Sequence, residues 1–309
     1  METSNLLVAR TSVSLLVVLA AGAWLSTPDN SPRSTPFYFP HPVPAVGDRS
    51  HVRQVSRSQG GTGQMEPTLA DAERLLYNAR YDAAATLALT LRASAPDDLA
   101  NYELRTSALL FQLRSILERT ADRPRAFDDC LACPDRMAAF LADTRHGQAL
   151  ARARLERDPH DQEALFFLGK LDLNYVWLQL GPLHRKKGWN EYSEGRKSLD
   201  AVLQQNPLHV RARVARAWVE YVIATKLPWG THWLVGGGSR EHALAEMRRA
   251  ATSGTDTFAH AEARFGLWEI LVRERRIGEA VDVARDLAHE FPENSALLRF
   301  LKRHGSAVT

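Results

Sequence analysis

Four prolines in the C-terminal part of the chain constrain its fold more than any other feature. They are Pro96, Pro159, Pro207 and Pro292, and the residues twelve positions before them are all small: Ala84, Gly147, Gly195 and Ala280. A small side chain lets two helix backbones approach closely, and a proline ends a helix because it lacks the N–H that the next turn needs. From Thr68 onward apolar residues recur at the helical spacing i, i+3, i+4, and no segment alternates as a strand would. The spacing therefore predicts an all-α fold of paired helices.

The pattern resembles the tetratricopeptide repeat (TPR), a helix-turn-helix unit of about 34 residues. The best single copy spans residues 261–294, and its matches to the key positions are Leu267, Leu271, Ile277, Ala280, Ala284, Leu287 and Pro292. Trp268 departs from the pattern because it stands where a small residue is usual. We therefore expect this helix pair to be splayed or to pack on an additional element.

The resemblance implies an all-α, right-handed superhelical solenoid of about five TPR-like helix pairs plus a capping helix, over residues 67–305. The pairs are expected at 68–95, 98–158, 161–206, 208–253 and 257–291, with the cap at 294–304. TPR proteins are generally scaffolds without chemistry of their own, and they present a concave groove formed by the first helices of their pairs. The resemblance therefore implies an open superhelix that binds a protein or peptide partner and is not an enzyme.

The N-terminal segment predicts export from the cytoplasm. Residues 6–25 are apolar apart from Arg10, which fits either a cleaved signal peptide or an uncleaved signal-anchor helix in residues 1–25. Residues 26–66 are rich in proline and lack periodic apolar residues, so they are expected to form a disordered linker. The chain is thus expected in the bacterial cell envelope, either periplasmic and secreted or held by one membrane anchor.

Three pairs are longer than the repeat, and in each the extra residues lie between the first and second helix. These long connections are near 120–135, at 181–188 and at 228–238, and insertions gathered on one edge of a solenoid often mark a binding face. The glycines at 236–238 lack the lysine of a phosphate-binding loop. Ser239 is therefore predicted to cap a helix, with weak anion binding at that helix start as the alternative.

The only two cysteines, Cys130 and Cys133, lie in the first long connection. Outside the cytoplasm a disulfide closing this turn is expected, with two reduced thiols or a redox-active or metal-binding pair as alternatives. No second pair of metal ligands and no catalytic motif accompanies them, so we predict no metal site, no cofactor and no catalytic residues.

Candidate partner-binding residues lie on first helices and in or beside the long connections. Those on first helices are Asn174, Tyr175, Arg211 and Trp218; the others are Trp189, Trp229 and Trp233, where exposed aromatic side chains are typical hot spots. The expected partner is a protein or peptide in the envelope, and the membrane is a further contact if the N-terminal segment is uncleaved. A net charge of +3 is too small to indicate nucleic acid.

Two alternative functions stay open at this point. One is a redox or metal-binding protein that acts through the Cys130 and Cys133 pair. The other is a small-ligand-binding partner of a solute transporter.

Overall fold

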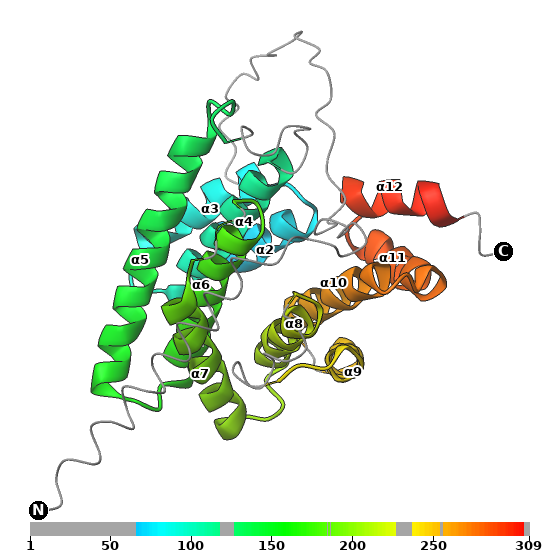
Figure 1. Ribbon diagram of the computed structural model, residues 1–309. Coiled ribbons are helices and arrows are strands. Elements are labelled where there is room, and N and C mark those ends of the chain that lie inside the picture. The colour runs from blue at the N-terminus through cyan, green and yellow to red at the C-terminus, as the bar shows by residue number, and fades with distance from the viewer. Residues whose placement is uncertain are drawn as a thin grey trace, which may run out of the picture.

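A computed structural model describes residues 66–117, 127–183, 185, 187–226, 237–253 and 256–305 (Figure 1). All regular structure within these ranges is helical. The helix predicted in residues 1–25 and nearly all of the linker predicted at 26–66 lie outside the described residues, and both stay predictions. None of the helices in the described ranges is long and apolar enough to span a bilayer.

Eleven helices follow one another along the described part of the chain. They are α2 (Leu69–Tyr77), α3 (Tyr81–Ser94), α4 (Leu99–Leu117), α5 (Cys133–Arg157), α6 (Gln162–Leu180), α7 (Trp189–Gln205), α8 (Val210–Lys226), α9 (Arg240–Ala251), α10 (Thr257–Arg273), α11 (Ile277–Glu290) and α12 (Ser295–His304). The helices α2 to α11 form the five predicted pairs in order, and α12 is the predicted cap. The prediction of an all-α stack of helix pairs is confirmed, while the handedness of a superhelix stays a prediction.

Polar side chains fix where several of these helices begin. Thr68 and Asp71 form a capping box at the start of α2, and Asp256 and Asn294 cap α10 and α12. Ser239 accepts a hydrogen bond of 3.2 Å from a backbone N–H in the first turn of α9. These oxygens satisfy N–H groups that have no partner inside the helix. Ser239 is thus a helix cap, as its position after the glycine run predicts.

The small residues before the prolines lie at close helix crossings. A Cβ atom on Gly147 would lie 2.7 Å from Leu171 Cδ1, and one on Gly195 would lie 2.8 Å from Asp172 Cβ. The Gly195 contact involves a Cβ atom that cannot turn away, so the crossing of α6 with α7 needs glycine, whereas at Gly147 the end of the Leu171 side chain would have to move aside. The alanines at the corresponding positions, Ala84 and Ala280, are fully buried.

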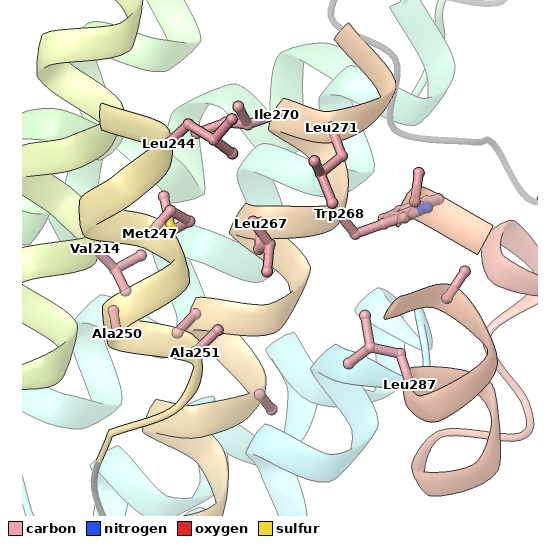
Figure 2. Packing of buried hydrophobic residues seen from close by; sticks show 14 of the residues in the cluster. Val214, Leu244, Met247, Ala250, Ala251, Leu267, Trp268, Ile270, Leu271 and Leu287 are labelled. Atoms are coloured by element: carbon pink, nitrogen blue, oxygen red, sulfur yellow. The ribbon is translucent and has the colours of Figure 1, made fainter. Parts of the chain in front are cut away.

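The largest core cluster among the described residues joins α8, α9, α10, α11 and α12 (Figure 2). Trp268 in this cluster is buried, and its ring meets Phe300 of α12 edge-on with centroids 5.5 Å apart. The additional element expected from the misfit of this tryptophan to the repeat is therefore the capping helix. The Trp268 ring is too large for a close helix crossing, and α12 covers the ring instead.

The two ends of the stack meet, which differs from the open superhelix implied by the resemblance. Tyr77 at the end of α2 stacks on Phe265 of α10 with centroids 5.4 Å apart, and it also contacts Phe258 and Phe291. Asn294 Nδ2 donates a hydrogen bond of 2.7 Å to the carbonyl oxygen of Tyr77. The first pair is thereby joined to the last pair and the cap, so the groove does not run open from one end of the stack to the other.

Candidate functional site

The first helices of the pairs, together with Tyr81 of α3 and residues of α12, line a partly open cavity of about 210 Å³, which we call the chamber. Most of its lining comes from α2, α4, α6, α8, α10 and α12, which are distributed along the whole described chain (Figure 1). Pockets for drug-sized ligands usually measure about 300–1,000 Å³, so this one suits a smaller molecule. The groove expected to hold a partner is therefore a pocket between the first helices that stays partly open to solvent.

Five charged side chains, one from each first helix, meet on the chamber wall. They are Glu73 of α2, Glu103 of α4, Lys170 of α6, Arg211 of α8 and Glu262 of α10, and we call them the central charge cluster. Arg211 joins three of the helices to its own, because its guanidinium contacts all three carboxylates. The cluster thus links helices whose residues lie far apart in the sequence.

Glu262 is the best-neutralised acid of this cluster. Lys170 Nζ lies 2.5 Å from its Oε1, and Arg211 Nε donates to its Oε2 at 2.7 Å. Burial opposes ionisation of the carboxyl, but these two cations outweigh burial and lower the pKa of Glu262 to about 2. Glu262 is therefore a fixed negative charge that holds both cations in place.

Glu73 is the least-neutralised acid. Its nearest cation is Arg211 Nη1, 3.6 Å from Oε1, and no hydrogen bond to its carboxylate is found among the described residues. Burial raises the pKa of Glu73 to about 7, and the carboxylates of Glu103 and Glu262 act in the same direction. This carboxyl therefore faces the chamber with its hydrogen-bonding capacity unused.

A chain of polar groups orients Glu103. Ser107 Oγ lies one turn further along α4 and donates to Glu103 Oε1 at 3.0 Å. Asn174 Nδ2 in turn donates to Ser107 Oγ at 3.0 Å and to Thr106 Oγ1 at 3.1 Å. These contacts join α6 to α4 and give the Glu103 carboxylate a hydrogen-bond donor on its own helix.

The remaining wall is mostly aromatic and aliphatic. Its large apolar side chains are Leu76, Tyr77, Tyr81, Leu104, Leu110, Phe111, Trp177, Val214, Trp218, Val222, Phe265 and Trp268. Further along α4 and α10, Arg114 pairs with Glu269, which also pairs with Arg273. Burial of a ligand body against this wall would supply the hydrophobic part of binding.

The predicted groove residues divide into three groups. Asn174, Arg211 and Trp218 line the chamber. Tyr175 lies outside it and packs in the core cluster around α4 and α5, and Trp189 is half exposed and stacks on Tyr192. The other two predicted residues, Trp229 and Trp233, lie outside the described residues.

Cys130 and Cys133 form a disulfide at the start of α5. Cys133 is fully buried, whereas Leu131 between them is 97% exposed. Phe127, next to this turn, and Leu183 of the second long connection pack in the same core cluster. In the part of the chain that the structure describes, no group of three or more metal-binding side chains is found.

Four members of the central charge cluster were not predicted: Glu73, Glu103, Lys170 and Glu262. A signal for them exists, since each lies within a first helix of a repeat, as the predicted Arg211 does. Single charges on helices usually face solvent, however, so this signal does not separate them from surface residues.

These observations define an all-helical repeat protein with a partly open chamber, whose wall is mostly apolar and carries the central charge cluster. A scan against protein-family models found no match, and a search of curated proteins found none either. Among solved structures, the chain is similar to a thermophilic TPR protein from Thermus thermophilus, with 18% identity and a TM-score of 0.41. That similarity covers 78% of this chain and 96% of the other.

Proposed function

We propose that this protein is a non-enzymatic binding module that holds a small molecule in the chamber. The observation that carries the proposal is the central charge cluster, to which five helices each contribute one side chain beside a cavity of about 210 Å³. Burying charges costs free energy that apolar packing does not, so such a cluster around a cavity favours a ligand site over a purely structural role.

The same geometry favours a small molecule over a peptide in the groove. A peptide-binding TPR-like scaffold needs its concave face open along several repeats. Here Tyr77 and Asn294 join the two ends of the stack across that face. A protein partner in the envelope therefore belongs to other surfaces of the molecule in this proposal.

The disulfide argues against the metal-binding alternative. Metal ions bind thiolates, and both sulfur atoms are already committed to each other. Cys133 is in addition fully buried, which hinders attack by an external thiol.

A small ligand agrees better with the second alternative, a binding partner of a solute transporter. The envelope location that this partnership requires is proposed from residues 1–25 alone.

The proposal is tested by filling the chamber. Val222 lines the chamber, so Val222→Phe places a ring in the cavity, whereas Leu208→Phe adds the same ring at a side chain that is 76% exposed. Binding of neutral, cationic and anionic fragments to the full chain is measured by ligand-observed NMR. We expect at least one fragment to bind the wild type and Leu208→Phe but not Val222→Phe. If no fragment binds the wild type, or all bind both variants equally, the proposal is wrong.

A further inference from the structure

We propose that the ligand of the chamber is a small organic cation, an ammonium group on an apolar body, with its charge held against Glu73. The inference rests on the proposed function, because it assigns a chemical class to the molecule in the same chamber. It is argued from charge balance, hydrogen-bonding capacity and the aromatic surroundings of this carboxylate.

The charge balance of the central charge cluster favours a cation. Three carboxylates face two cations, Lys170 and Arg211, which leaves one carboxylate in excess when Glu73 is ionised. Asp256, at the start of α10, adds a further negative charge near Glu73. An incoming ammonium ion would balance this excess, whereas an anion would increase it.

The two cations of the cluster are poor sites for an anionic ligand. Arg211 already contacts three carboxylates, and Lys170 lies 2.5 Å from Glu262 and 3.6 Å from Glu103. An anion would have to displace these partners and leave buried carboxylates unpaired, which is costly. Glu73 offers the opposite situation, because its carboxylate accepts no hydrogen bond among the described residues.

The surroundings of Glu73 suit an organic rather than a metal cation. Tyr77 lies one turn from Glu73 on α2, and Trp218 and Phe265 line the same chamber. Tyr77 and Phe265 stack on each other, and Arg273 lies over the Trp218 ring, so these side chains supply an apolar surface for the body of an organic ligand. A metal ion would instead need several converging oxygen, nitrogen or sulfur ligands, and no such group occurs among the described residues.

The protonation of Glu73 supplies a signature for this site. Burial is the main cause that raises the pKa of Glu73 to about 7. The carboxyl is therefore largely neutral at about pH 6 and largely ionised at about pH 8. The charged groups that act on the Glu73 carboxyl are Arg211 of α8, Glu103 of α4, Glu262 of α10 and Asp256, which caps α10. An alkylammonium ion keeps its charge over this range, as lysine does. Its affinity should therefore rise between about pH 6 and pH 8.

The test uses three probes of similar size on the full chain: 2-phenylethylammonium, 2-phenylethanol and phenylacetate. Their dissociation constants are measured by calorimetry at about pH 6 and about pH 8. The variant is Glu73→Gln, which keeps the shape of the side chain. The control is Glu156→Gln on the exposed surface of α5.

We expect 2-phenylethylammonium to bind the wild type and Glu156→Gln more tightly at the higher pH. In Glu73→Gln its affinity should fall by about tenfold to a hundredfold and lose the pH dependence. Binding of 2-phenylethanol should be similar in all three proteins, which shows that the variant chamber is intact.

Different failures have different meanings. If the alcohol or the carboxylate binds as tightly as the ammonium ion, or Glu73→Gln binds all probes as the wild type does, the assignment to cations is overturned while the chamber remains a ligand site. If no probe binds the wild type, the cation assignment fails, and the proposed function fails too if the fragment panel against Val222→Phe is also negative.

Discussion

Asp172 shows how a single residue can make the stability of this fold depend on pH. Its carboxyl is fully buried on α6, where Oδ1 accepts a hydrogen bond of 2.6 Å from Gln148 Nε2. The other oxygen, Oδ2, has no hydrogen-bond partner among the described residues. Burial, followed by the nearby Glu194 carboxylate, raises the pKa of Asp172 to about 8. The folded protein therefore holds this proton well above the pH at which the unfolded chain loses it.

We predict that Asp172→Asn weakens the pH dependence of stability. Between about pH 4 and pH 8 the folded wild type keeps a proton that the unfolded chain has released. The free energy of unfolding therefore falls as the pH rises, by at most about 1.4 kcal/mol per pH unit from this group. The asparagine variant lacks this contribution, and it should be relatively more stable at about pH 8.

Urea unfolding of the variant at a series of pH values measures the effect. The control is Asp286→Asn, which makes the same change at an exposed side chain of α11. Parallel stability curves for the wild type and Asp172→Asn would show that Asp172 is ionised in the folded protein. Protonation of Glu73 also makes the free energy of unfolding fall as the pH rises, up to about pH 7.

At the scale of helices, the two helices of the first pair and the two helices of the last pair are connected by the same type of turn. Ala79 between α2 and α3 has a φ of 59°, and Arg275 between α10 and α11 has a φ of 57°. In each turn the backbone N–H of the next residue donates a hydrogen bond of 2.9 Å to the carbonyl oxygen five residues earlier. The pairs are Arg80 with Leu75 and Arg276 with Leu271. A side chain disfavours this left-handed conformation, and glycine adopts it freely.

We predict that Ala79→Gly and Arg275→Gly each raise the free energy of unfolding by up to about 1 kcal/mol. The control is Ala83→Gly inside α3, where glycine should lower it by about 1 kcal/mol. Thermal or urea unfolding of the full chain measures all three. A loss of stability in both turn variants would contradict the left-handed geometry.

The order of the helices could be predicted from the sequence because its signals are local. A proline after the second helix and a small residue twelve positions earlier mark four of the five units, whatever the rest of the chain does. Trp268 also signalled an additional packing element, and α12 is that element. These rules depend only on helix geometry and on close backbone contact.

The chamber could be predicted only in part, because it depends on contacts between distant residues. The expectation that the first helices of the pairs form the groove led to Asn174, Arg211 and Trp218, which line the chamber. It did not reveal that Tyr77 meets residues more than 180 positions later, since no local pattern encodes that contact. Without the closure, charges such as Glu73 and Glu262 are indistinguishable from surface residues.

For the molecule as a whole, closure of the stack converts a groove into a chamber, and every proposal about binding depends on it. The contact most accessible to experiment lies at the junction of the ends. The N–H of Glu293 donates to Asn78 Oδ1 at 3.1 Å, and Arg80 pairs with Glu293 at 3.4 Å. The Glu293 side chain is 60% exposed, so a reagent can reach it.

Cross-linking at this junction tests the closure most directly. The double variant Asn78→Cys and Glu293→Cys is treated with a short bis-maleimide at low protein concentration, and the native cysteines are held in their disulfide. We predict one rapid cross-link within each molecule, identified by the mass of the joined peptides. If the two new cysteines are modified separately, or are joined only between molecules, the ends do not meet in solution and the chamber does not exist.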